Sequence, residues 1–363
     1  MRAEVIIAVR GEVPANLNRT LTNVALTIGP DDGICVVWDG EEPYALHEID
    51  FLRQERLAEP RGCGHARHFG ITTSPADYVV LIDGHMQFPL GWLDAVCTHL
   101  RRHGKDITCT INRSVRHDWT PYSEIDSGAE LCLHVDGPRV EPYGPAREFY
   151  GLVAQWRKGA RPGVVAAPMG ACYGMRRAWY GTIGRPLGIL DAWGCDEELL
   201  GVCSWLCGGR VYCLDIETRH VHNAPRINRS VDTLEIWANR AAVLLSIPGA
   251  PSETTAYIRQ TRVNWPDIDR RVAARADRIE ALRAHLAAGA RTFDRMLTAG
   301  LITRNPATIV SKSANPAPRP SAFHGQTQPG RCDRCNAVGC VRHVAVGEVY
   351  MRCLSCGHRR RVG

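Results

Sequence analysis

The stretch VVLIDGHMQF, residues 79–88, decides how the rest of the chain is interpreted. Four apolar, strand-forming residues lead directly into Asp83, Gly84 and His85. In an open α/β sheet, ligands collect at the carboxyl ends of the strands. A carboxylate and an imidazole two positions apart at such an end can point toward one cation. The alternative is an ordinary exit from a strand, with Asp83 capping the turn and His85 in solvent.

The segments around this stretch alternate between short apolar strands and helices. The predicted strands cover residues 5–9, 34–38, 78–82 and 107–111, and the predicted helices cover 14–28, 62–74 and 90–100. Such alternation is typical of a mostly parallel sheet with helices on both faces. The fold class predicted for the N-terminal part is therefore α/β.

The periodicity weakens over residues 113–162, which predict long loops with one short strand at 131–135. Regular structure is expected again in strands 163–168 and 210–216 and in helices 196–207, 231–245 and 267–298. Residues 304–330 carry Pro, Ser, Asn and Gly without apolar periodicity, which is typical of a linker. The predicted domains are a main domain (1–245), a helical extension (246–303), the linker (304–330) and a small module (331–363).

The composition is that of a soluble globular protein, with 45% hydrophobic and 23% charged residues. At 363 residues the chain can form one large α/β domain plus a small one. No apolar run approaches the roughly 20 residues that span a bilayer, and the N-terminus lacks the pattern of a signal peptide. We therefore expect no membrane partner and a cytoplasmic location, in a host cell if the chain is encoded by a virus. The oligomeric state is not predicted.

Five of the 15 cysteines cluster at the C-terminus. Cys332 and Cys335, and then Cys353 and Cys356, form two Cys-x2-Cys pairs, and two such knuckles give the tetrahedral sulfur site that zinc prefers. A module this short cannot bury enough core to fold without the metal. The spacing therefore predicts a structural zinc in a zinc ribbon, with Cys340 and His343 as competing ligands.

The same module is rich in arginine, which suits contact with the phosphate backbone of a nucleic acid. The net charge of +6 is a further, mild bias toward polyanionic partners. A solvated basic tail or a surface that docks a protein remains the alternative. The arginines in question are Arg331, Arg334, Arg342, Arg352, Arg359, Arg360 and Arg361.

Four separated stretches resemble the polypeptide N-acetylgalactosaminyltransferases, within the larger group of family-two-type glycosyltransferases. They are residues 5–24, 64–96, 170–180 and 191–222, and they follow one another in the family's order. The resemblance implies a GT-A fold, in which a Rossmann-like nucleotide half is fused to an acceptor half. The zinc ribbon stands where the family has a lectin domain.

The resemblance also implies a metal site, usually held by manganese, with magnesium as the alternative. Asp83 and His85 would bind the metal, and His222 would be the third protein ligand. The family pattern Arg-x-x-His matches Arg219 and His222 better, but His220 lies only two residues earlier, so the register stays open.

Three further residues are expected to bind the donor. Asp39, which ends the second strand, would lie near the nucleoside, or it is a plain turn residue. Arg67 could face the diphosphate, and Gly170 begins the glycine-led strand of the resemblance.

The start of helix 196–207 carries the candidate catalytic residues. Trp193 would set its indole against the sugar or the acceptor. Asp196 matches the family's glutamate, and Glu197 follows it, so the chain has Asp-Glu-Glu where the family has Glu-Asn. In inverting relatives a carboxylate here takes the acceptor proton, whereas the retaining family needs no protein base, and retention is expected. The alternative is favourable negative charge at a helix N-terminus.

Together these features predict a metal-dependent glycosyltransferase that uses a nucleotide sugar, with a UDP-sugar expected. The basic ribbon favours a hydroxymethylated pyrimidine in DNA as acceptor, reached in the major groove or flipped out of the helix. The alternatives are a protein or polysaccharide acceptor, or a non-catalytic nucleic-acid-binding protein on a GT-A scaffold.

Overall fold

The computed structural model describes residues 2–134, 151–221, 233–250 and 265–305, and four short segments near the C-terminus. It divides into two compact units, Met1–Thr308 and Ile309–Gly363. Among the described residues, no helix combines the length and the apolar character needed to cross a membrane.

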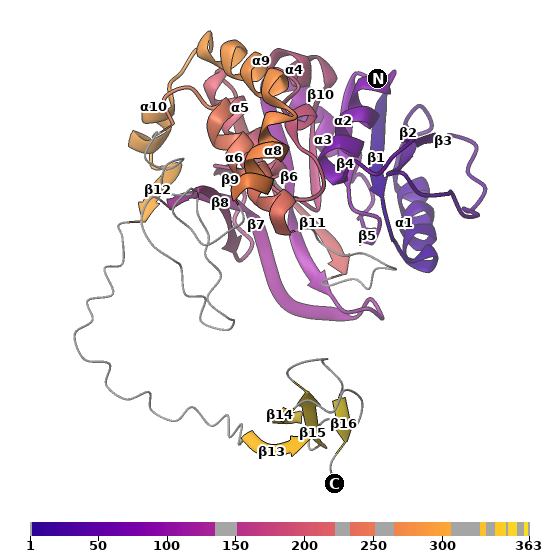
Figure 1. The fold of residues 1–363 in the computed structure, drawn as a ribbon. Helices are drawn as coiled ribbons and strands as arrows, with labels where there is room; N and C mark the ends of the chain where they lie inside the picture. The colour runs from indigo at the N-terminus through magenta and orange to yellow at the C-terminus, as the bar shows by residue number, and fades with distance from the viewer. Residues whose placement is uncertain are drawn as a thin grey trace. The chain divides into compact units, whose positions relative to one another are not determined.

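The first unit is built around a 12-stranded mixed sheet (Figure 1). Its main path runs β12-β7-β6-β10-β4-β1-β2-β3; β11 pairs with β5, β6 and β9, and β8 pairs with β7. The strands are β1 (Ala3–Val9), β2 (Gly33–Trp38), β3 (Leu52–Arg56), β4 (Tyr78–Ile82), β5 (Met86–Gln87), β6 (Asp106–Val115), β7 (Pro121–His134), β8 (Gly151–Lys158), β9 (Gly163–Val165), β10 (Cys172–Arg176), β11 (Arg210–Val221) and β12 (Ile302–Asn305).

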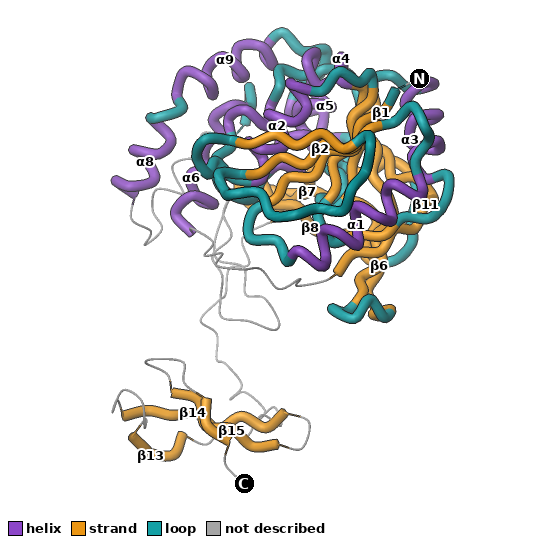
Figure 2. Tube along the Cα trace, turned by 90° about the vertical axis from the view of Figure 1, so that its right-hand side faces the viewer, coloured by secondary structure: helices purple, strands orange, loops and turns teal. Residues whose placement is uncertain are grey.

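Helices pack against this sheet and against each other. α2 packs on β1 and β2, α3 on β6 and β10, and α5 on β11, while α6, α8 and α9 form a group (Figure 2). The helices are α1 (Pro14–Thr27), α2 (Cys63–Thr73), α3 (Trp92–Arg102), α4 (Arg177–Thr182), the 3-10 helix η1 (Pro186–Ile189), α5 (Asp196–Leu206), α6 (Thr233–Ser246), α8 (Trp265–Ala273), α9 (Ala276–Ala287) and α10 (Phe293–Thr298).

The parallel strands β2, β1 and β4 form the middle of the N-terminal half. Every residue of β2 and β4 is buried, as expected for strands covered on both faces. The chain visits β2 and β3 on one side of β1 before it crosses to β4 on the other. This reversal leaves a crevice at the carboxyl ends of β1 and β4, where ligands of open α/β sheets bind. Asp83 follows β4 directly.

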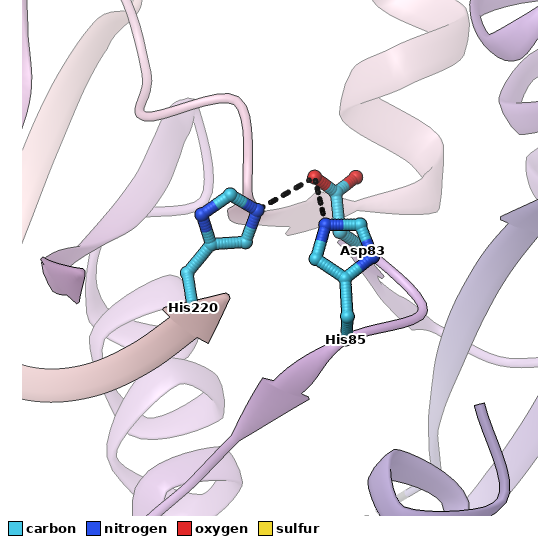
Figure 3. A group of neighbouring side chains, drawn as sticks. All are labelled: Asp83, His85 and His220. Atoms are coloured by element: carbon cyan, nitrogen blue, oxygen red, sulfur yellow. Dashed lines mark ion pairs between the residues drawn. The ribbon is translucent and has the colours of Figure 1, made fainter. Parts of the chain in front are cut away.

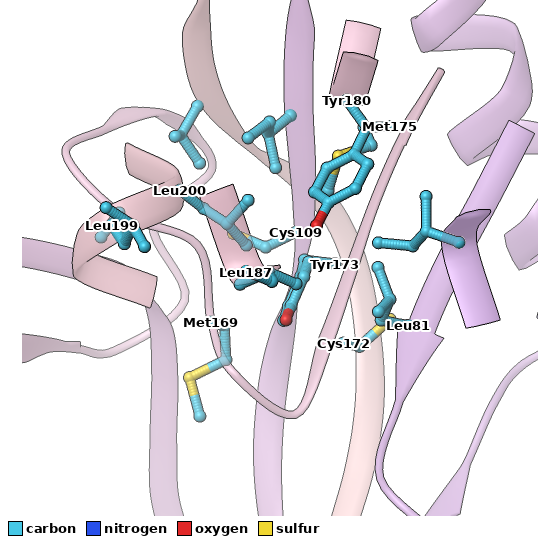
Figure 4. Close-up of a cluster of buried hydrophobic side chains, with 14 of the residues drawn as sticks. Leu81, Cys109, Met169, Cys172, Tyr173, Met175, Tyr180, Leu187, Leu199 and Leu200 are labelled. Atoms are coloured by element: carbon cyan, nitrogen blue, oxygen red, sulfur yellow. The ribbon is translucent and has the colours of Figure 1, made fainter. Parts of the chain in front are cut away.

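The core next to this crevice is formed by β4, β10 and the helices behind them (Figure 4). Tyr173 and Leu81 lie opposite each other on paired antiparallel strands. Leu187, Leu199 and Leu200 are fully buried in the same cluster. This packing fixes β4 and the N-terminus of α5 relative to one another, and both contribute to the candidate site.

Most of the predicted elements are present within a few residues of their expected bounds, and three interpretations were wrong. Residues 113–162 are not mainly loops, because β7 and β8 form a long antiparallel ladder there. The expected helix 267–298 is three helices, α8 to α10. The sheet is mixed rather than mostly parallel, because β10 inserts antiparallel between β4 and β6.

The second unit contains a four-stranded antiparallel sheet in the order β13-β14-β15-β16. Its strands are β13 (Thr327–Arg331), β14 (Val338–Ala345), β15 (Glu348–Cys353) and β16 (Arg359–Arg361). Cys340 lies opposite Cys353 in the β14–β15 pair. Cys332, Cys335 and Cys356 lie outside the described residues, so the zinc site stays a prediction.

Candidate active site

Three side chains that could hold a metal ion meet at the carboxyl end of β4 (Figure 3). Asp83 follows β4, His85 precedes β5, and His220 lies near the end of β11, which pairs with β5. Their ligand atoms all lie within 4.8 Å of one another. Asp83 Oδ2 is 3.3 Å from His220 Nε2 and 3.9 Å from His85 Nε2.

The orientation of His85 is fixed by a buried carboxylate. His85 Nδ1 lies 2.7 Å from Oε2 of Glu12, and both side chains are buried. A proton on Nδ1 can be donated to Glu12, which leaves the Nε2 lone pair directed at Asp83. Gly84 leaves room for this contact, because a Cβ there would lie 3.1 Å from Glu12 Cγ. The pair sets up one imidazole nitrogen for a cation.

Asp83 is held in its ionised form. Burial raises the pKa of Asp83, but the hydrogen bond from His220 and the charge of Arg67 outweigh that effect and hold the pKa well below its usual range. Arg67 Nη2 donates to Asp83 Oδ1 at 2.8 Å. The other oxygen, Oδ2, faces both histidines.

Arg67 itself is buried and links two carboxylates. Its guanidinium pairs with Asp83 on one side and Asp196 on the other, and it donates to the carbonyl of Gly170 at 3.1 Å. The Tyr173 hydroxyl donates to Asp196 Oδ2 at 3.2 Å. The guanidinium expected to face a diphosphate therefore connects the metal group to the N-terminus of α5.

The N-terminus of α5 brings two carboxyl groups together. Burial and the neighbouring Asp196 charge raise the pKa of Glu197 well above its usual range. Gly170 makes this arrangement possible, because a Cβ there would lie 1.8 Å from Glu197 Oε1. Two negative charges this close repel each other, which favours the protonated form of Glu197, and Arg67 pairs with Asp196.

Asp39 accepts hydrogen bonds from the chain that begins α2. Its carboxylate takes the backbone N–H groups of Arg61, at 2.6 Å, and Gly62, at 2.8 Å. It also lies 3.6 Å from Arg10 Nη1. Asp39 thus serves the turn, as the alternative interpretation expected, and it lines the same cleft as the metal group.

Apart from Tyr173, these residues line one cleft of about 640 Å³. Trp193, 47% exposed, also lies on its wall, and its contact with a ligand stays a prediction. The sequence interpretation missed Arg10, Asn112 and Trp156, which also line the cleft. Asn112 lies just before the region 113–162 that was predicted to be loops, and Trp156 lies within it, so no period-2 signal identified them.

A second missed feature is an ionic network around Asp191. Arg61 and Arg278 contact its carboxylate at 2.7 and 3.2 Å, and the buried Arg275 lies at 3.6 Å. Arg275 also contacts Glu235 on α6 at 2.9 Å. The group of α6, α8 and α9 therefore supports the loop that leads into α5.

His222 lies outside the described residues, so its assignment as third ligand is untested. Within the described part of the chain, His220 is the histidine next to Asp83 and His85. No local sequence signal separates His220 from His222, because the position of His220 depends on how β11 pairs with β5.

Comparison with known proteins adds a family and a fold. Residues 4–180 match the family model Glycosyl transferase family 2. A Drosophila melanogaster protein named "Putative inactive polypeptide N-acetylgalactosaminyltransferase 11" is 22% identical over 214 residues, which are 57% of this chain and 37% of that protein. Human polypeptide N-acetylgalactosaminyltransferase 18 is 22% identical over 171 residues, or 45% and 26% of the two chains. The chain thus spans well under half the length of these relatives.

A crystal structure described as GalNAc-T7 with UDP, GalNAc and Mn2+ aligns with a TM-score of 0.55 at 14% sequence identity. The alignment covers 82% of this chain and 57% of the other. Likeness at this level of identity concerns the fold, and it confirms the predicted GT-A class.

Proposed function

Because residues 4–180 carry a glycosyltransferase family 2 domain with a GT-A fold, we propose that this chain is a metal-dependent glycosyltransferase. It would move a sugar from a nucleotide sugar, a UDP-sugar in this proposal, to a hydroxyl group. The observation that carries the proposal is the group of Asp83, His85 and His220, which lies at the carboxyl end of β4 on the wall of a cleft.

The donor set fits a divalent cation. One ionised carboxylate and two imidazoles make a mixed oxygen and nitrogen set, which suits Mn²⁺ better than Mg²⁺, because Mg²⁺ prefers oxygen ligands. Asp83, His85 and His220 would hold the ion, with Glu12 orienting His85. When bound, the ion would neutralise the charge that develops on the departing diphosphate.

The donor is proposed to lie at the carboxyl ends of β1 and β4. Arg10 follows β1, is half-exposed and lines the cleft, so its guanidinium can reach a phosphate oxygen. Arg67 is already engaged by Asp83 and Asp196, and we assign it to positioning those carboxylates rather than to the diphosphate.

The carboxyl pair at α5 is proposed to act at the reacting sugar. Burial and the neighbouring Asp196 raise the pKa of Glu197, and its protonated form can donate a hydrogen bond into the cleft, while Asp196 pairs with Arg67. A protonated carboxyl group is not a general base. We therefore favour a retaining reaction, in which a phosphate oxygen of the donor takes the acceptor proton. Trp193 would offer its exposed indole to the sugar or the acceptor.

For the acceptor we favour a hydroxymethylated pyrimidine in DNA, because the C-terminal module carries seven arginines that suit phosphate contacts. The cleft is lined by nine Asp and Glu side chains against five Arg and Lys. Away from the metal group and Arg10, which would hold the donor diphosphate, this acidic lining disfavours the phosphates of a nucleic acid and favours a neutral group such as an extruded base. A polysaccharide or protein acceptor is the alternative. The third alternative is a non-catalytic nucleic-acid-binding protein, because one of the similar proteins is named as an inactive transferase.

One experiment separates these readings. The full chain is incubated with Mn²⁺, a panel of UDP-sugars and either plain or hydroxymethylated DNA, and the DNA is digested to nucleosides for mass spectrometry. We expect a hydroxymethylpyrimidine heavier by one sugar residue, absent from plain DNA and absent in chelator. UDP release without modified DNA would favour another acceptor, and no UDP release from any donor would favour the non-catalytic reading.

A further inference from the structure

One face of the sheet extends from the metal group to β8 and carries polar and aromatic side chains into the cleft. Residues two apart on a strand share a face, and directly paired residues on neighbouring strands share it too. His220 of β11 pairs with Ser114 of β6, and Asn112 of β6 pairs with Asp126 of β7, which in turn pairs with Lys158 of β8. We call this the β6–β8 face: Asn112, Ser114, Asp126, Trp156 and Lys158, all of which line the cleft.

The β6–β8 face lies apart from the carboxyl ends of β1 and β4, where the donor is proposed to bind. In the strand order, β6 and β10 separate β7 from β4 and β1, whose carboxyl ends would hold the donor. Neighbouring strands are about 4.8 Å apart, so the three steps from β11 to β8 span roughly 14 Å. That length leaves room for one ring beside the donor sugar.

Two side chains on this face, Asn112 and Trp156, present groups that a ligand in the cleft could contact. Asn112 is 2% exposed, and its Oδ1 has no hydrogen-bond partner among the described residues. Such a buried, unsatisfied acceptor calls for an explanation, and a ligand in the cleft supplies one. Trp156 is 39% exposed although it lines the cleft. An indole exposed there offers a flat face on which a ring can stack.

The charges on the face fit a neutral ring with hydrogen-bonding edges. Asp126 is buried and lies 3.0 Å from Lys158 Nζ, which also lies 3.6 Å from Glu124. An asparagine both donates and accepts, and a carboxylate accepts from the exocyclic amino group of cytosine.

We propose that the β6–β8 face is the acceptor subsite, and that it holds one pyrimidine ring extruded from DNA, stacked on Trp156 and hydrogen-bonded by Asn112 and Asp126. The inference rests on the proposed function and deepens it. In this arrangement the phosphates of the DNA strand stay outside the acidic cleft. Extruding a base from duplex DNA costs free energy for unpairing and unstacking, whereas a base in single-stranded DNA is already unpaired.

The test measures binding of a labelled single-stranded oligonucleotide that contains one 5-hydroxymethylcytosine. The full chain is used with UDP and Mn²⁺, and binding is followed by fluorescence anisotropy. Trp156→Ala should weaken binding about ten-fold or more, since a base stacked on an aromatic ring is lost, and Trp156→Phe should restore most of it. Tyr122→Ala is the matched control, because Tyr122 is also 39% exposed on the neighbouring strand but does not line the cleft.

Two further measurements make the result decisive. The affinity for UDP with Mn²⁺ should be the same in wild type and Trp156→Ala, and free 5-hydroxymethylcytidine should compete with the oligonucleotide on the wild-type protein. Wild-type affinity in Trp156→Ala, or competition by oligosaccharides or peptides but not by the nucleoside, would overturn the inference. Absence of any UDP binding to the wild-type protein would instead count against the proposed function itself.

Discussion

At the scale of single residues, the contact between Glu12 and His85 is expected to control metal binding. Glu12 accepts from Nδ1 of His85 at 2.7 Å and so decides which nitrogen faces the cation. Glu12→Gln should weaken Mn²⁺ affinity by about 10–100-fold, the usual effect of losing such an orienting carboxylate. Titration of Mn²⁺ followed by electron paramagnetic resonance measures it.

Glu124→Gln is the control for that titration, because Glu124 lines the same cleft but is not in the metal group. An equal loss of affinity in both variants would mean that only the overall charge of the cleft matters.

Glu197 makes a second prediction, on pH. Its folded-state pKa is raised by burial and by Asp196, from a usual value of 4.5. The stability that its protonated form contributes is full below that usual value and is lost as pH rises toward the raised folded pKa. Gln cannot ionise, so the melting temperature of Glu197→Gln should rise relative to that of the wild type as pH is raised above 4.5, the usual pKa of a glutamate. A difference between the two proteins that does not change with pH would refute the assignment of a proton to Glu197.

At the scale of elements, the backbone at the start of α2 packs directly against the backbone of the loop before α5. A Cβ on Gly62 would lie 1.8 Å from the carbonyl oxygen of Ala192, and Gly62 has a φ of 94°. Because backbone cannot move aside as a side chain can, Gly62→Ala should cost roughly 2–5 kcal/mol of unfolding free energy, from overpacking plus strain. Urea denaturation measures the loss.

Gly91→Ala separates the two contributions to that loss. Gly91 also has a positive φ, 74°, but a Cβ there would meet nothing within 4 Å. Only the strain of a left-handed residue remains, roughly 1–2 kcal/mol. If the two variants lose equal stability, the contact with Ala192 contributes nothing.

The elements also show which features can be predicted from local sequence and which depend on contacts between distant segments. Asp83 and His85 were found because a run of buried residues and a local motif lie side by side in the chain. The third histidine depends on how β11 pairs with β5, a non-local register that places His220 beside Asp83 in the described chain. Trp156 could not be found, because β8 is an edge strand whose period-2 pattern is interrupted by charged residues. Arg67 was predicted to bind the donor, and the structure instead pairs it with two carboxylates, Asp83 and Asp196, that are not adjacent to it in sequence.

At the scale of the whole molecule, the two compact units should respond independently to damage. If Cys332, Cys335, Cys353 and Cys356 hold zinc, Cys353→Ser should lose one zinc per chain and leave the main thermal transition unchanged, because that transition belongs to Met1–Thr308. Cys340→Ser tests the competing ligand, since Cys340 lies opposite Cys353 in the sheet, and it should keep its zinc if the two Cys-x2-Cys pairs are the ligands. Elemental analysis and calorimetry measure both effects, and loss of zinc in Cys340→Ser alone would reassign the ligands.

The central claim is that Asp83, His85 and His220 hold a metal through which a nucleotide diphosphate binds the cleft. Isothermal titration of the full chain with UDP tests it most directly, with Mn²⁺ and then with chelator, in wild type and in His220→Ala. We predict clear binding to the wild type with Mn²⁺, and loss of about ten-fold or more in affinity in chelator and in His220→Ala, because the diphosphate charge is no longer neutralised. UDP binding of equal strength under all of these conditions would contradict the account.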